Sequence, residues 1–355
     1  MQFKIKQMPK LSTRGNSMPE SPIRKLAPFA DLAKEKGHKV YHLNIGQPDI
    51  KSPEIAINAI KNIQLDIIEY GPSAGYESYR KKLAQFYTNQ NVNVNTEDIL
   101  ITTGGSEALL FALGSIMDPE DELIIPEPFY ANYSAFAAES AAKVVPVNSG
   151  FETGFELPSI ADFEKLITPK SKAILICNPN NPTGGAISIP EIRRILDVAP
   201  NAMVLIDEAY VEFSGTTALG LLDEFENLFV SRTMSKAYGM AGLRCGFLLS
   251  SASNMGWVRK AQSPYSVNFV AIAAAVAAIA DKEYVENYVR EVVQARSFVV
   301  AELDRLGIQQ FHWLKPVQQK AQLNLNATAV HLLLCCQDVV NQANAIKPRR
   351  CRLQS

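Results

Sequence analysis

The sequence predicts an α/β fold in which a largely parallel sheet is sandwiched between helices. From about residue 50 to residue 265, strand-like and helix-like patterns alternate, which is typical of βαβ units. The apolar runs Ala173–Cys177 and Met203–Ile206 each end in polar residues, as buried strands do at the edge where ligands bind. Ile101–Thr103 leads into a glycine turn and the start of a helix. With 355 residues, of which 47% are hydrophobic, the chain is long enough for two domains.

Helical patterns flank this alternating region on both sides. Residues 1–45 predict an amino-terminal arm and a first helix. Val267–Leu306 predicts a long helix whose apolar face is interrupted near the middle by Asp281 and Lys282. The longest apolar run, Phe269–Ala280, is shorter than the roughly 20 residues that span a bilayer, so it predicts a buried helix.

Composition excludes several classes of ligand. A net charge of −1 gives no electrostatic reason to expect a nucleic acid or an anionic membrane as partner. The five cysteines lack the spacing of metal ligands or disulfides and the four histidines are scattered, so no metal site is expected. The amino terminus is charged and has no apolar segment of signal-peptide length. We therefore expect a cytoplasmic protein that acts on small molecules.

The most informative stretch runs from Ser231 to Arg244 and contains Lys236 among hydroxyls and small residues. A lysine amine attacks carbonyls when its surroundings lower its pKa, and the product is a Schiff base. Lys236 would bind the aldehyde of pyridoxal phosphate, while Thr233, Ser235 and Arg244 would bind its phosphate. Taken alone, the stretch also fits a turn-to-helix junction with a solvated lysine.

Two further segments favour the cofactor interpretation. Asn178–Gly184 is a turn-rich loop after one predicted strand, and Asp207 ends the next. A carboxylate at that place can pair with a protonated pyridine nitrogen and keep the ring an electron sink. Each segment has a simpler interpretation, a loop that turns the chain and an Asp that caps a helix. Their joint occurrence with Lys236, in this order and spacing, is what favours pyridoxal phosphate.

With these motifs, the chain resembles the class I/II aminotransferases, which are fold type I pyridoxal-phosphate enzymes, over about residues 45–306. The resemblance implies a large domain with a mostly parallel, seven-stranded sheet between helices, and a small α/β domain. It implies that residues 1–48 form an arm and part of the small domain. Residues 49–265 would form the large cofactor-binding domain, and 266–355 a long linking helix and a small domain of atypical sequence.

The resemblance also implies roles for individual residues. Lys236 matches the lysine that forms the Schiff base and moves the proton, and Asp207 matches the carboxylate on the pyridine nitrogen. Asn181 and Tyr210 match the two groups that hydrogen-bond the phenolic oxygen of the ring. The residues expected around the phosphate are Thr233, Ser235, Arg244 and, at a strand–turn–helix junction whose backbone N–H groups face an anion, Gly104, Gly105 and Ser106.

Other residues match positions at the rim of the family's site. Tyr130 matches the aromatic residue that stacks on the cofactor ring, whereas we interpret Tyr133 as a core aromatic. Tyr70 resembles the tyrosine that reaches the cofactor phosphate of the neighbouring subunit, which implies a homodimer. Gly46 matches a glycine whose backbone lies against the substrate carboxylate, where a side chain would obstruct approach. Gly46 is therefore an expected substrate contact, and the resemblance implies that Asn181 is another.

The reaction implied is ping-pong transamination between an amino donor and a 2-oxo acid, with 2-oxoglutarate as the expected acceptor. Residues 207–213, 232–244 and 264–268 are similar to histidinol-phosphate aminotransferases. Asn44–Asp49 and the segment around Tyr70 are more similar to the aspartate and broad-specificity branch. The alternatives are an aspartate-type aminotransferase, another fold type I enzyme such as a lyase or decarboxylase, and a catalytically impaired protein that binds the cofactor.

Residues 308–355 depart from the family pattern. The family's small domain supplies an arginine that pairs with the substrate carboxylate. Here the segment contains one acidic residue, Asp338, many Gln and Asn, and a basic end with Arg349, Arg350 and Arg352. These arginines either replace the missing one or form a solvated tail. The departure is the reason for keeping the catalytically impaired alternative.

Overall fold

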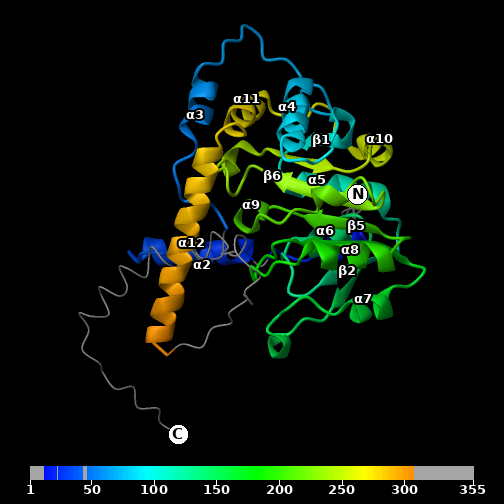
Figure 1. Ribbon diagram of the computed structural model, residues 1–355. Coiled ribbons are helices and arrows are strands. Elements are labelled where there is room, and N and C mark those ends of the chain that lie inside the picture. The colour runs from blue at the N-terminus through cyan, green and yellow to red at the C-terminus, as the bar shows by residue number, and fades with distance from the viewer. Residues whose placement is uncertain (1–11, 22, 43–45, 308–355) are drawn as a thin grey trace, which may run out of the picture.

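The computed structural model describes residues 12–21, 23–42 and 46–307, and its centre is a seven-stranded sheet (Figure 1). The strand order is β1-β7-β6-β5-β4-β2-β3. β7 is antiparallel to both of its neighbours, and the remaining neighbouring pairs are parallel. The strands are β1 (Ile99–Thr102), β2 (Glu122–Pro126), β3 (Lys143–Val147), β4 (Ser171–Cys177), β5 (Met203–Asp207), β6 (Leu228–Thr233) and β7 (Gly246–Leu249). The predicted α/β fold with a mostly parallel, seven-stranded sheet is confirmed.

Both faces of the sheet are apolar, because successive side chains of a strand point to opposite faces. In β4, Ile174 and Ile176 belong to one buried cluster and Ala173 and Leu175 to the other. Such continuous apolar strands are stable only when helices cover the sheet on both sides.

Helices supply that cover. The helices that contribute buried residues to the cluster of Ile174 are α3 (Glu54–Lys61), α4 (Glu77–Thr88), α7 (Ile160–Leu166), α8 (Ile189–Val198) and α11 (Phe269–Ala278). Those that contribute to the other cluster are α5 (Gly105–Ile116), α6 (Tyr133–Glu139), α9 (Val211–Ser214), α10 (Ala252–Ala261) and α12 (Lys282–Arg305). The remaining helical segments are α1 (Thr13–Ser17), α2 (Ala27–Glu35) and the 3₁₀ turns Arg24–Leu26, Thr96–Asp98, Phe151–Thr153, Ala218–Leu221 and Ala241–Leu243.

The stretch predicted as one long helix from Val267 to Leu306 is two helices, α11 and α12. Asp281 lies between them and its carboxylate accepts a hydrogen bond from the backbone N–H of Tyr284, at 3.1 Å. A carboxylate in this position caps a new helix, so the polar interruption seen in the sequence ends α11 and starts α12. α12 has 24 residues and stands at one side of the sheet (Figure 1).

A buried ion pair joins the end of β6 to the segment after β5. Arg232 Nη2 lies 2.7 Å from Glu208 Oε2, and both residues are buried. Glu208 also accepts hydrogen bonds from the backbone N–H of Ala218 and the hydroxyl of Thr217. A buried pair is tolerated only with such additional hydrogen bonds. These contacts fix the two backbone segments that carry Asp207 and Thr233.

Among the helices between residues 12 and 307 that the structure describes, none is long and apolar enough to cross a membrane. The expected cytoplasmic location stays a prediction. So do the domain boundaries at 48 and 265, and the expectations for residues 308–355 lie outside the described residues.

Candidate active site

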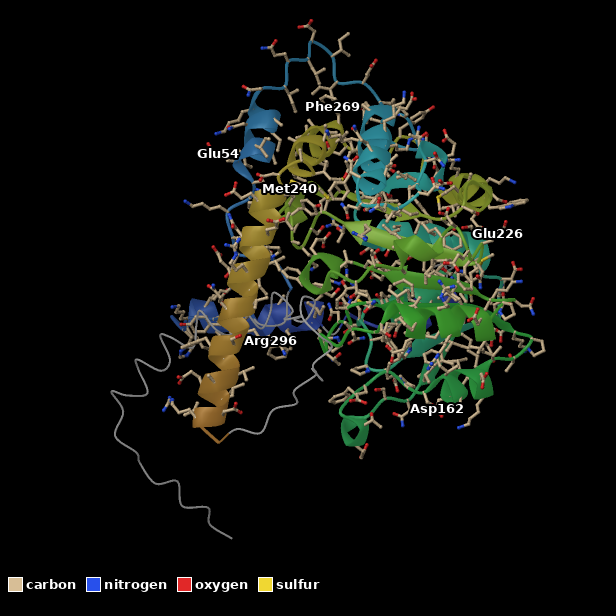
Figure 2. All side chains as sticks on the ribbon, in the orientation of Figure 1. Glu54, Asp162, Glu226, Met240, Phe269 and Arg296 are labelled. Carbon is tan, nitrogen blue, oxygen red and sulfur yellow. The ribbon has the colours of Figure 1, made fainter. Side chains whose placement is uncertain are left out.

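The site forms at one edge of the sheet because parallel strands end at the same edge. Asn181 follows β4, Asp207 ends β5 and Lys236 follows β6. Since β7 runs antiparallel, it begins at this edge, and Arg244 lies just before it. The loop after Lys236 leads to Met240, which Figure 2 labels near the upper end of α12. The structure therefore brings together residues that are up to 63 positions apart in the sequence.

Lys236 is the lysine that the sequence predicts to form the Schiff base. Its Nζ donates a hydrogen bond to the carbonyl oxygen of Gly46 at 2.7 Å and lies 5.3 Å from the centre of the Tyr210 ring. Burial lowers the pKa of Lys236 from its usual 10.5 to about 8, against the opposing effect of the Asp207 charge. About half of the amine is therefore neutral at pH 8, and the neutral amine is the nucleophilic form.

The turn that follows β6 positions this lysine. The hydroxyl of Thr233 donates to Ser235 Oγ at 2.9 Å and accepts from the backbone N–H of Ser235 at 3.1 Å. The N–H of Gly239 donates to the carbonyl of Lys236 at 2.9 Å, and Gly239 has a φ of +62°. A Cβ at Gly239 would also overlap the hydroxyl of Tyr284 in α12, so this position requires glycine.

Asp207 supplies a buried carboxylate, with only 7% of the residue exposed. It accepts hydrogen bonds from the hydroxyl of Tyr133 at 2.6 Å, the hydroxyl of Ser231 at 2.9 Å and the N–H of Ala209 at 3.2 Å. Burial raises the pKa of Asp207, and these hydrogen bonds together with the charge of Lys236 oppose the rise.

Asn181 and Tyr210 lie together beside Asp207. The side-chain amide of Asn181 donates to Tyr210 Oη at 3.0 Å. Burial raises the pKa of Tyr210, so its hydroxyl stays protonated and remains a hydrogen-bond donor. The two groups predicted to contact one ring oxygen are therefore within hydrogen-bonding distance of each other.

An anion site lies at the amino end of α5. Gly104 has a φ of +90°, and the helix starts at Gly105 and Ser106, whose N–H groups have no acceptor within the helix. Arg244 Nη1 donates to Ser235 Oγ at 3.3 Å, and its Nη2 donates to the carbonyl of Thr103 at 3.4 Å. A Cβ at Gly104 would overlap this guanidinium. The amino end of α5, the guanidinium of Arg244 and the hydroxyl of Ser235 therefore lie together, and all three can bind an anion.

A second glycine makes this convergence possible. A Cβ added to Gly246, the first residue of β7, would lie 2.5 Å from the carbonyl carbon of Gly104 and 2.7 Å from the nitrogen of Gly105. Only glycine lets β7 approach the turn so closely. Arg244 itself has a φ of +54°, a left-handed conformation that is costly for a residue with a side chain and that occurs often at functional sites.

The remaining predicted residues lie at the rim of the site. Tyr130 is half-buried, and its hydroxyl accepts a hydrogen bond from Asn132 at 2.7 Å. Tyr70 is 81% exposed and stacks on Tyr265 with ring centres 5.0 Å apart. Gly46 contacts Lys236 through its carbonyl. The roles predicted for Tyr130, Tyr70 and Gly46 toward cofactor, partner subunit and substrate stay predictions.

Two contacts of the site are not predicted by the sequence. Ser231 pairs in register with Asp207 across β5 and β6, a relation that only the alignment of the strands reveals. Tyr133 is fully buried, as expected of a core aromatic, but its hydroxyl bonds to Asp207. The sequence signal was its position three residues after Tyr130.

These groups fit pyridoxal phosphate by the chemistry of the donors and acceptors. Lys236 offers an amine for the aldehyde, Asp207 an anion for the pyridinium nitrogen, and the α5 end with Arg244 a cationic cradle for the phosphate. Within the described ranges, no cluster of three or more His, Cys, Asp or Glu side chains could hold a metal ion.

Comparisons with known proteins agree with this geometry. Residues 38–317 match the family described as aminotransferase class I and II. Histidinol-phosphate aminotransferase 2 of Carboxydothermus hydrogenoformans is 32% identical over 72% of this chain and 70% of its own. Histidinol-phosphate aminotransferase of Acinetobacter baumannii is 30% identical over 80% of this chain and 77% of its own. The solved aspartate aminotransferase of Thermotoga maritima has a TM-score of 0.79 and 27% identity, covering 84% of this chain and 81% of its own.

The lowered pKa of Lys236 leads to a prediction for the protein freed of cofactor. Competitive acetylation over a pH series, read by mass spectrometry of the Lys236 peptide, should show half-maximal reactivity near pH 8, because burial disfavours the protonated amine. The control is the same peptide in the urea-unfolded protein, where the midpoint should move up to about 10.4. A folded-state midpoint above 10 would contradict the buried, neutral amine.

Proposed function

Because this chain belongs to the class I and II aminotransferases, which are pyridoxal-phosphate enzymes, we propose that it transfers the amino group of histidinol phosphate to a 2-oxo acid, with 2-oxoglutarate as the acceptor. Transamination itself follows from the family. The choice of donor is supported by the names of the relatives, at 32% and 30% identity, against 27% for the aspartate aminotransferase structure.

In this proposal Lys236 is the catalytic base. Its buried amine has a pKa of about 8 and lies beside the Tyr210 ring, so the neutral fraction can take the proton from the substrate Cα and, with the cofactor bound, would return it at the carbon of the cofactor's former aldehyde. Pyridoxal phosphate, when bound, supplies the electron sink for the pair left at Cα. The placement of this amine just after β6, next to the strand β5 that ends in the buried carboxylate of Asp207, is the observation that carries the mechanism.

The other residues bind and orient. The Asp207 carboxylate would pair with the pyridinium nitrogen, and Asn181 and Tyr210 would donate hydrogen bonds to the ring oxygen. The residues that would hold the phosphate are Gly104, Gly105, Ser106, Thr233, Ser235 and Arg244. Tyr130 would cover one face of the ring. Gly46 and Asn181 would contact the substrate.

The donor is tested by steady-state kinetics of the cofactor-loaded protein with 2-oxoglutarate, following glutamate by mass spectrometry. We expect kcat/KM for histidinol phosphate to exceed that for aspartate by at least about tenfold, a difference of about 1.4 kcal/mol in transition-state binding. The Lys236→Ala protein gives the background rate.

Each other result identifies a different function. A preference for aspartate would assign the chain to the aspartate-type branch. Release of ammonia or carbon dioxide without a keto product would indicate a lyase or decarboxylase. A bound cofactor with no turnover of any donor would indicate a catalytically impaired protein. The atypical sequence of residues 308–355 is the reason for considering this alternative.

We also propose that the active unit is a homodimer. The loop between α3 and α4 exposes a patch of apolar side chains, made of Leu65, Ile67, Ile68 and Tyr70 together with Tyr265. Contiguous exposed apolar side chains of this kind mark contact surfaces.

Light scattering during gel filtration should therefore give twice the 39.1 kDa mass of the chain. Ile68→Asp, at the most exposed residue of the patch, should shift the mass toward that of one chain, whereas Ile55→Asp, outside it, should not. A wild-type protein with the mass of a single chain at micromolar concentration would refute the assembly.

A further inference from the structure

The Asp207 carboxylate is held by hydroxyl groups on both of its oxygens. Tyr133 Oη donates to Oδ2 at 2.6 Å from α6, and Ser231 Oγ donates to Oδ1 at 2.9 Å from β6. The N–H of Ala209 adds a third donor to Oδ1, at 3.2 Å. Asp207 thus receives donors from three different segments, which leaves its plane little freedom to rotate.

We infer that Tyr133 is a positioning residue, whose hydroxyl holds Asp207 as an oriented anion aimed at the pyridine nitrogen of the cofactor. The inference rests on the role proposed above for Asp207. Tyr133 acts through Asp207 and is distinct from Tyr130, the residue proposed to cover the ring.

The packing of Tyr133 fixes where its hydroxyl lies. The residue is fully buried, its ring meets Tyr130 edge-on with centres 5.4 Å apart, and it stacks on Phe129 with centres 6.4 Å apart. A buried hydroxyl requires a hydrogen-bond partner, and Asp207 provides it. The aromatic cluster therefore serves as a rigid support that presents one hydroxyl to one carboxylate oxygen.

The donors around Asp207 favour its charged form. A backbone N–H such as that of Ala209 can only donate, and its hydrogen bond to Oδ1 is stronger when the carboxylate is charged than when it is protonated. Burial acts in the other direction and raises the pKa of Asp207. Among the titratable groups around Asp207, the charge of Lys236 lowers the pKa of Asp207, whereas the Asp207 charge raises the pKa of Tyr130, Tyr133, Cys177 and Tyr210, which stay neutral.

Tyr133 contributes a hydrogen bond and no proton of its own. Burial and the neighbouring Asp207 charge raise the pKa of Tyr133 well above its usual value, so its hydroxyl stays protonated. The hydrogen bond from Tyr133 lowers the pKa of Asp207, whereas burial raises it. We therefore expect the pKa of Asp207 to rise when the hydroxyl of Tyr133 is removed. The carboxylate would then be neutralised at a higher pH, and the acid limb of activity would move up.

Tyr133→Phe tests the inference, since it removes the hydroxyl and keeps the ring. We expect kcat to fall about 10- to 100-fold, as for loss of a hydrogen bond to a charged group. The acid limb of the kcat profile should move up by about one pH unit. The dissociation constant of pyridoxal phosphate, measured by equilibrium dialysis without substrate, should rise about tenfold.

Tyr79→Phe is the matched control, because Tyr79 is also fully buried and its hydroxyl accepts a long hydrogen bond from the Cys245 thiol, at 3.9 Å, remote from Asp207 in the chain. It should leave the acid limb and the cofactor affinity unchanged. Equal behaviour of Tyr133→Phe and Tyr79→Phe would overturn the inference.

Asp207→Asn separates this inference from the proposed function. If Asp207→Asn loses turnover while Tyr133→Phe does not, the positioning role alone is wrong. If Asp207→Asn also turns over normally, the role of Asp207 is wrong and the inference fails with it. Should Tyr133→Phe not fold, 3-fluorotyrosine in place of Tyr133 gives a stronger donor of nearly the same size. It should move the acid limb down, and an unmoved limb would overturn the inference.

Discussion

Burial at the carboxyl edge of a parallel sheet is the constraint on which the rest of the site depends. Because β4, β5 and β6 end at one edge, Asn181, Asp207 and Lys236 meet there. Removal from water then acts oppositely on the two charged groups. It lowers the pKa of Lys236 to about 8, which increases the neutral fraction of the amine, and it requires partners for the Asp207 carboxylate.

The alternation of side chains along β6 separates two electrostatic systems. Ser231 faces Asp207, whereas Arg232 points to the opposite face of the sheet and pairs there with Glu208. The ion pair connects the backbone of the strand ends without placing its charges beside the residues predicted to bind the cofactor. In β6, Ser231 therefore orients the Asp207 carboxylate, and the next residue, Arg232, holds the strand end through its ion pair with Glu208.

Local signals predicted the alternating strands and helices of the sheet, and they placed Lys236, Asp207, Asn181 and the turn at Gly104 at the ends of apolar runs, where the structure has them; the roles of these residues stay predictions. The hydroxyls of Tyr133 and Ser231 could not be predicted, because their contacts depend on how α6 packs and on the register of β5 and β6. The break between α11 and α12 was visible as Asp281 and Lys282, but only the cap geometry shows that a new helix begins. The small domain expected from residues 308–355 lies beyond the residues described.

Covalent mapping tests the central claim most directly. The claim is that the aldehyde of pyridoxal phosphate binds to the amine of Lys236 at the carboxyl edge of the sheet. The protein is loaded with pyridoxal phosphate, reduced with borohydride and digested, and the modified peptide is identified by mass spectrometry. We expect one pyridoxyl group per chain, on Lys236, and none in the Lys236→Ala protein. Stoichiometric labelling of another lysine, or no label on a protein that retains the cofactor, would contradict it.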